Sequence, residues 1–213
     1  IELKEDEKSG SKDSYLALFK QKYVWLFFLG IFCYVSTEQG TSIFMSTFLE
    51  QYHGVNPQTD GAQAVSYFWG LMTTGCLVGM LLLKLIDSKR LLQISGVLTI
   101  VLLLSALFGS KGIALIAFPA VGFSISMMYS IVFSLALNSA SQHHGSFAGI
   151  LCSAIVGGAG GPMIVSTIAD ATSLRTGMLF ILVFVGYITF IGFWARPLIN
   201  NKTVKLKKLL KKA

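Results

Sequence analysis

Long apolar stretches, separated by short polar segments, run along most of the 213-residue chain. A helix needs about 20 predominantly apolar residues to cross the hydrocarbon core of a bilayer. Six stretches approach that length, and charged residues, glycine, proline or asparagine bound each one, which predicts six membrane-spanning helices. We place these spans at Tyr23–Leu49, Ala62–Ile86, Leu91–Phe108, Ile113–Asn138, Phe147–Ala169 and Leu174–Ala195.

The distribution of Lys and Arg predicts how the spans are oriented, because positive loop residues are retained on the cytoplasmic side. When the loops are assigned to alternate sides, only Lys111 and Arg175 of the 17 positive residues fall on the outer side. An odd number of spans would destroy this asymmetry, so the charges favour an even number with both termini in the cytoplasm. The positive residues of the cytoplasmic side are Lys4, Lys8, Lys12, Lys20, Lys22, Lys84, Lys89, Arg90, Arg196, Lys202, Lys205, Lys207, Lys208, Lys211 and Lys212.

The composition supports a membrane class and weakens other classes. Hydrophobic residues make up 54% of the chain and charged residues 13%, whereas about a quarter of a soluble domain is charged. Positive residues occur only where apolar runs stop, which argues against a nucleic-acid-binding surface. The polar first fourteen residues do not resemble a signal peptide, and the initial Ile suggests a fragment of a longer chain.

The sequence offers little for catalysis or metal binding. The three cysteines, Cys33, Cys76 and Cys152, lie apart inside apolar runs, which favours a packing role. His143 and His144 lie in a cytoplasmic loop without a carboxylate or Cys nearby in sequence. No catalytic triad or paired carboxylates occur, so we expect no enzyme, no cofactor and no metal site.

A polar stripe marks the first span. Glu38 lies near its middle, where burying a carboxylate costs a few kcal/mol or more on insertion scales. Polar side chains recur around it at intervals of three and four residues, which gathers them on one helix face. Either this face lines a substrate cavity in which Glu38 accepts hydrogen bonds or exchanges a proton, or a protonated Glu38 bonds to a neighbouring helix. The stripe consists of Tyr34, Glu38, Thr41, Ser42 and Ser46.

The second and fourth spans also carry polar faces. On the second span, Gln63, Ser66, Gly70 and Thr74 share one face, and a Gly75-xxx-Gly79 pair lets backbones approach closely. On the fourth span, Tyr129, Ser134 and Asn138 lie toward the cytoplasmic half. Tyr129 either stacks on or hydrogen-bonds a sugar, or is a packed aromatic side chain.

Two further segments are candidates for movement or packing. Gly157, Gly158 and Pro162 belong to a glycine-rich stretch of the fifth span, which is typical of a close-packed or flexing membrane helix. Asp87 and Arg90 lie in a charged turn that is either a topology signal or an ion-pair latch between helices. The basic tail that follows Lys202 either lies on anionic lipid as a short helix or is solvated.

Four segments together resemble a known family. They are Tyr34-Val35-Ser36-Thr37-Glu38, the run from Ala62 to Gly70, Tyr129 with Phe133 to Leu137, and Gly157-Gly158-Ala159 through Asp170. Between about Lys20 and Asn201 the chain resembles the C-terminal half of a major facilitator transporter of the fucose:proton symporter group, which includes glucose/galactose permeases. The chain departs from the family pattern at Ser36-Thr37, Cys76 and Ser130, where the family usually has Gly-Ala, Arg and Pro.

The resemblance implies an all-α membrane protein whose six transmembrane helices form the C-terminal bundle of a twelve-helix fold. Residues 1–19 then form a cytoplasmic linker, 20–198 the bundle and 199–213 a basic cytoplasmic tail. The implied location is the bacterial inner membrane. The implied partners are a monosaccharide, a proton, membrane lipids, and a missing N-terminal half or a second copy, with the proton-coupling carboxylates mainly in the missing half. The candidate substrate-binding residues are Glu38, Tyr34, Ser42, Gln63, Tyr129 and Asn138, and the candidate gating or packing residues are Asp87, Arg90, Gly157, Gly158 and Pro162.

A competing interpretation remains open from the sequence. The chain can also be a six-helix membrane module that associates with itself or with another chain and does not transport a solute independently. Whether the purified chain is monomeric or dimeric distinguishes this interpretation from the first.

Overall fold

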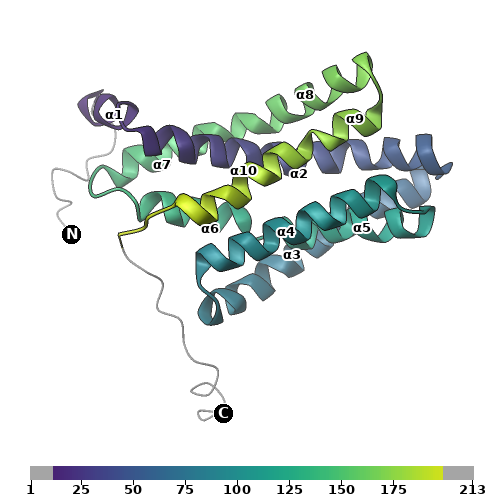
Figure 1. The fold of residues 1–213 in the computed structure, drawn as a ribbon, viewed down its shortest axis with the longest axis horizontal. Coiled ribbons are helices and arrows are strands. Elements are labelled where there is room, and N and C mark those ends of the chain that lie inside the picture. Colours follow the sequence, from purple (N-terminus) through teal and green to yellow (C-terminus); the bar gives the residue numbers. More distant parts are fainter. Residues whose placement is uncertain (1–11, 199–213) are drawn as a thin grey trace, which may run out of the picture.

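The computed structural model describes residues 12–198, and all regular structure in that part of the chain is helical. The all-helical prediction is therefore confirmed. Figure 1 shows long helices that run side by side along one axis. The elements are α1 (Lys12–Phe19), α2 (Lys22–His53), the π-helical turn η2 (Pro57–Gly61), α3 (Ala62–Leu85), α4 (Ser88–Phe108), α5 (Lys111–Ile125), α6 (Met128–Leu137), α7 (His144–Ser153), the 3-10 turn η3 (Ala154–Val156), α8 (Gly157–Ala171), α9 (Leu174–Leu179) and α10 (Ile181–Trp194).

Each predicted span coincides with one helix or with helices in succession. Five segments of the described residues are long and apolar enough to cross a membrane, and there are up to six if α1 and α2, bent by 87°, count as one span. The polar stripe makes α2 less apolar than the others, although it is the longest helix at 32 residues. The five segments are Pro57–Leu85, Ser88–Phe108, Lys111–Leu137, His144–Ala171 and Leu174–Trp194.

Local sequence chemistry sets several helix ends. The carboxylate of Asp87 accepts a hydrogen bond from the Lys89 backbone N–H (3.0 Å), so α4 begins at Ser88, three residues before the predicted start. Gly54 ends α2 in the left-handed conformation (φ 60°), which glycine adopts without strain. The segment between the first two predicted spans is partly helical, because Asn56 caps the turn Pro57–Gly61 that leads directly into α3.

Three of the spans are not single α-helices. The predicted fourth span is broken between α5 and α6 at Ser126 and Met127, and the predicted fifth span contains the 3-10 turn η3. The last span passes from α9 into α10 at Phe180. Breaks in membrane helices are tolerated where neighbouring groups satisfy the freed backbone. At the first break, the Ser126 hydroxyl donates to the Phe123 carbonyl (2.8 Å).

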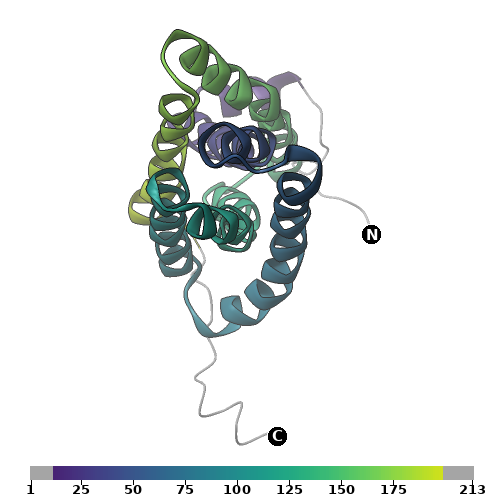
Figure 2. The ribbon, with the colours of Figure 1, turned by 90° about the vertical axis from the view of Figure 1, so that its right-hand side faces the viewer.

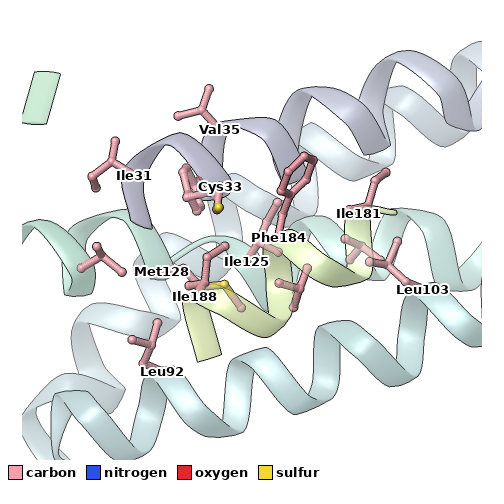
Figure 3. Close-up of a cluster of buried hydrophobic side chains, with 14 of the residues drawn as sticks. Ile31, Cys33, Val35, Leu92, Leu103, Ile125, Met128, Ile181, Phe184 and Ile188 are labelled. Atoms are coloured by element: carbon pink, nitrogen blue, oxygen red, sulfur yellow. The ribbon is translucent and has the colours of Figure 1, made fainter. Parts of the chain in front are cut away.

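Helix α2 occupies the middle of the bundle and contacts α8, α10, α5 and α6 (Figure 2). Apolar side chains from several helices meet beside it, and Figure 3 draws part of this buried cluster, including Cys33 of α2 and Phe184 and Ile188 of α10. By contrast, α3 lies at the edge of the bundle and packs mainly on α5. The buried residues of α3 are Ala64, Phe68, Gly75 and Gly79.

The two ends of the bundle differ in charge. The α3–α4 turn, the start of α2 and the end of α10 lie at one end (Figure 1), with Lys22, Lys84 and Arg196 nearby in sequence. At the other end, the guanidinium of Arg175 lies 4.5 Å from the ring centroid of Tyr52 and 5.5 Å from that of Phe108. These cation–π contacts join the ends of α2, α4 and α9.

Glycine allows α2 and α8 to approach closely. The Ser36 hydroxyl of α2 donates to the Gly157 carbonyl (3.0 Å), and a Cβ on Gly157 would collide with the Phe32 carbonyl. A Cβ on Gly161 would collide with Ser36. Gly158 faces Val35 of α2 as well, so this part of the glycine-rich stretch is a packing surface.

We predict that Gly157→Ala destabilises the folded chain by about 1–3 kcal/mol, because the added methyl group forces α2 and α8 apart. Thermal unfolding in detergent, followed by circular dichroism, measures the effect. Gly186→Ala in α10 is the matched control, since nothing lies within 4 Å of its added Cβ. Equal unfolding midpoints for the two variants would contradict the close α2–α8 contact.

Candidate functional site

The polar stripe of α2 divides into two groups in the structure. Ser42 donates to the Gln39 carbonyl (3.3 Å) and Ser46 to the Pro57 carbonyl (3.4 Å), so both hydroxyls serve the backbone. Thr41 is fully buried, and its hydroxyl has no hydrogen-bond partner among the described residues. Tyr34 and Glu38, one helical turn apart, form the second group, and their side chains interact.

Glu38 is only partly buried. Its Oε1 accepts a hydrogen bond from the Gln39 side-chain amide (3.1 Å). A carboxylate has about four acceptor positions, so further donors, such as the hydroxyl groups of a ligand, have room to bind there. Among residues 12–198 no cation pairs with this carboxylate, so its charge is not neutralised by the described part of the bundle.

An aromatic cluster adjoins this carboxylate. The ring centroids of Tyr34 and Tyr129 are 5.6 Å apart, and those of Tyr129 and Phe133 are 5.8 Å apart with an interplanar angle of 22°. Tyr34 is buried, whereas Tyr129 is partly exposed. Residues far apart in the sequence, on α2 and α6, thus form one surface that combines a carboxylate with aromatic rings.

The break between α5 and α6 positions Tyr129. The Cys76 thiol of α3 donates to the Ser126 carbonyl (3.3 Å) at this break. Gly75 and Gly79 of α3 lie directly against Ser126 and Met127, because a Cβ on either glycine would meet those side chains. The predicted close approach at the Gly75-xxx-Gly79 pair is thereby observed, and it holds the segment that leads into Tyr129.

A hydrogen bond between two hydroxyl groups also joins α5 to α4, close to the break between α5 and α6. Thr99 and Ser124, both buried, form a side-chain hydrogen bond of 2.7 Å. Thr99 donates to the Ser95 carbonyl (2.8 Å) and Ser124 to the Val121 carbonyl (2.9 Å). A side-chain hydrogen bond between two membrane helices, such as that of Thr99 and Ser124, contributes about 0.6 kcal/mol on average.

Asn138 does not join the Glu38 cluster. It follows α6, nine residues after Tyr129, which at about 1.5 Å per residue places it roughly 13 Å further along the axis. Its amide donates to Ser134 (3.4 Å), and it lines a cavity of about 250 Å³ together with Lys84 and Asp87. Between the two regions, a groove follows the exposed side of α6 and is lined by Tyr129, Ser130, Phe133, Ser134, Leu137 and Asn138.

Gln63 also lies away from the cluster, near the start of α3. It is exposed, and its amide donates to the Tyr67 hydroxyl (2.8 Å). Asn138 lies at the opposite end of the bundle, because α3 begins where α2 ends and α6 runs toward the α3–α4 turn (Figure 1). The six candidate substrate residues are therefore spread along the length of the bundle.

The side chains of the charged turn bond to backbone groups of the neighbouring helices. Asp87 caps α4, and the Lys89 ammonium donates to the Ala195 carbonyl (2.7 Å) after α10. Arg90 is exposed, and no ion pair joins it to Asp87 in the described range. Pro162 lies inside α8, in the stretch that packs on α2.

Two cysteines lie beside the aromatic cluster. Their proximity to it could not be predicted from the sequence. Cys33 is buried, as its apolar context predicts, whereas Cys76 and Cys152 are exposed. Cys76 lies near Tyr34, and Cys152 of α7 lies near Tyr129. Phe133 was also missed as a site residue, although its spacing of four residues from Tyr129 places it on the same helix face.

Comparison with known proteins adds independent information. Residues 2–162 match the Major Facilitator Superfamily. A glucose/galactose transporter of Brucella abortus biovar 1 (strain 9-941) is 33% identical over 193 residues, which cover 90% of this chain and 47% of that protein. A putative glucose/galactose transporter of Helicobacter pylori (strain ATCC 700392 / 26695) is 30% identical over 182 residues, covering 84% of this chain and 44% of that protein. The chain spans about half the length of these curated relatives.

Solved structures show the same fold. A crystal structure of the E. coli fucose:proton symporter FucP superposes with a TM-score of 0.80 at 18% identity, covering 90% of this chain and 47% of that one. A structure of FucP in the outward conformation gives a TM-score of 0.81 at 18% identity, with 91% and 47% covered. At this identity the likeness concerns the fold alone.

We predict that N-ethylmaleimide modifies two cysteines of the folded chain and all three after unfolding in dodecyl sulfate, because only Cys33 is buried. Intact mass spectrometry counts the adducts. A Cys33→Ala variant should still acquire two adducts when folded. Modification of Cys33 in the folded chain, or protection of Cys76 and Cys152, would contradict the arrangement of α2, α3 and α7.

Proposed function

The chain belongs to the Major Facilitator Superfamily, and we propose that it supplies the C-terminal six-helix half of a monosaccharide transporter. The descriptions of its relatives as glucose/galactose transporters support this class of substrate. Because the chain spans about half of their length, the proposed transporter contains a second six-helix half. Rocking of the two halves around a site between them would give alternating access.

The observation that carries the proposal is the cluster of Glu38, Tyr34 and Tyr129. A monosaccharide presents hydroxyl groups around its edge and C–H groups on its faces. The carboxylate of Glu38 accepts hydrogen bonds from hydroxyls, and the partly exposed ring of Tyr129 offers an apolar face. Retaining an ionisable group in the middle of a span is costly, which supports a functional role for Glu38.

The remaining candidate residues fit a route through the membrane. We place Gln63 toward the outer mouth of this route and Asn138 toward its cytoplasmic mouth, with the Glu38 cluster between them. The groove on α6 runs from Tyr129 to Asn138 and carries the exposed hydroxyls of Ser130 and Ser134. Ser42 instead supports α2, because its hydroxyl bonds to the backbone.

Proton coupling is proposed for the same carboxylate. Within the described spans, Glu38 is the carboxylate that lies farthest from the helix ends, since Glu50, Asp60, Asp87 and Asp170 all lie near a terminus. An ionisable group in this position marks an ion or proton pathway in membrane proteins. Exchange of a proton at Glu38 would link the charge of the site to sugar binding.

We predict that Glu38→Gln weakens monosaccharide binding roughly ten- to hundredfold, the loss expected when a hydrogen bond to a charged group becomes a neutral one. Isothermal calorimetry with glucose, galactose and fucose measures the affinity of the chain combined with the N-terminal half of a related permease. Glu50→Gln, the same change at the exposed end of α2, is the matched control and should bind normally.

The same titrations test the competing function. Binding by the combined halves, and none by the chain alone, is the result expected of a site between two bundles. Unchanged affinity of Glu38→Gln would remove this carboxylate from the site. Failure of the combined halves to bind any of the three sugars would favour an associating membrane module instead.

We also propose that both termini face the cytoplasm of a bacterial inner membrane, as the Lys and Arg distribution indicates. Green fluorescent protein fused after Ala213 should then fluoresce, whereas alkaline phosphatase at the same position should be inactive. Alkaline phosphatase fused after Gly54, at the far end of α2, should be active. The reverse pattern would invert the proposed orientation.

A further inference from the structure

A second cavity lies at the end of the bundle where α2 begins and α10 ends. Its volume is about 350 Å³, and it is separate from the Glu38 cluster because the residues of α2 that line it precede Tyr34 by nearly two turns or more. Three segments far apart in the sequence form it. The lining residues are Lys22, Tyr23, Leu26, Phe27, Ser139, Trp194 and Arg196.

This cavity is lined by two cations and by no carboxylate. Lys22 and Arg196 are both exposed, and neither forms an ion pair within residues 12–198. No Asp or Glu is among its lining residues, although Asp13 of α1 and Asp87 before α4 lie at the same end of the bundle. Two cations thus converge on one cavity whose lining includes no carboxylate, which favours an anionic ligand.

The walls of the cavity are aromatic and apolar. Phe27 and Trp194 contact each other with ring centroids 5.0 Å apart, and Tyr23 packs edge-on against Phe147 (5.7 Å). Aromatic side chains with a polar tip are enriched at the level of lipid headgroups. Their presence beside Lys22 and Arg196 is consistent with a position at the membrane–water interface.

Apolar side chains continue from the cavity onto the outer surface of the bundle. Leu26 is 39% exposed, and Phe190 and Phe193 of α10 are 57% and 66% exposed. The Tyr187 hydroxyl donates to the Leu26 carbonyl (2.9 Å), which joins α10 to α2 at this level. A ligand with its charge in the cavity therefore has an apolar surface beside it for hydrocarbon chains.

We propose that this cavity binds the phosphodiester headgroup of an anionic phospholipid, with Lys22 and Arg196 on the phosphate and the acyl chains along Leu26, Phe190 and Phe193. A basic cavity between membrane helices that opens onto lipid suits such a headgroup. A free phosphate ester would use the two cations but not the apolar surface. The inference does not depend on the proposed sugar transport, because it involves none of the residues of that site.

Fluorescence quenching by brominated lipid tests the proposal. The chain has three tryptophans, so Trp25→Phe with Trp69→Phe leaves Trp194 as the reporter inside the cavity. The protein is reconstituted in phosphatidylcholine vesicles that contain either brominated phosphatidylglycerol or brominated phosphatidylcholine at equal mole fraction. We expect phosphatidylglycerol to bind at least about five-fold more tightly, since each cation near the surface contributes about that factor.

Substitution of the cations supplies the decisive comparison. Lys22→Gln with Arg196→Gln should reduce the preference for phosphatidylglycerol to about one. Lys12→Gln with Arg90→Gln removes the same charge from exposed residues that do not line the cavity, and should retain the preference. Arg196→Lys keeps the positive charge and should retain most of the preference for phosphatidylglycerol. This variant controls for a loss of folding. Circular dichroism confirms that each variant is helical.

Three results would overturn the proposal. The first is equal quenching by the two brominated lipids in the unsubstituted background. The second is a preference that persists in the Lys22→Gln, Arg196→Gln variant. The third is release of the quenching by millimolar glycerol 3-phosphate, which would assign the cavity to a soluble phosphate ester and not to a lipid.

Discussion

The contact between α2 and α8 holds the central helix of this bundle in place. In lipid there is no strong hydrophobic force between helices, so close packing through small residues and interhelical hydrogen bonds takes its place. Gly157 and Gly161 provide the close approach, and the Ser36 hydroxyl bonds to the Gly157 carbonyl. With one side of α2 fixed in this way, the side that carries Tyr34 and Glu38 is directed away from α8 toward α6.

The second half of the site depends on a break in a helix. Because α5 ends at Ile125 and α6 begins at Met128, backbone carbonyls at the break need donors from side chains. The Ser126 hydroxyl and the Cys76 thiol supply them, and the glycines of α3 bring that helix close enough to do so. Tyr129 follows directly after this segment, so its ring is held against Tyr34 by contacts that extend to α3.

The two ends of the bundle hold their positively charged side chains in different surroundings. At one end, Arg175 is surrounded by the rings of Phe48, Tyr52 and Phe108, so its charge is held within the protein. At the opposite end, Lys22 and Arg196 line a cavity and form no ion pair within the described part of the chain. Arg175 thus joins helices at one end, whereas Lys22 and Arg196 at the other end are without an ion-pair partner among residues 12–198.

The sequence by itself determined the spans, their approximate lengths and the polar face of α2, because hydropathy and helical periodicity act along one segment at a time. It also indicated the close packing of Gly157, since small residues gathered on a membrane helix are typical of a close helix–helix interface. Only the tertiary structure decided which polar residues meet. Tyr129 meets Tyr34, which interacts with Glu38, whereas Asn138 and Gln63 lie elsewhere, although all of these residues lie on polar faces. The break at Ser126 and the exposure of Cys76 and Cys152 were equally out of reach, because they follow from which helices are neighbours, and side-chain packing sets that choice.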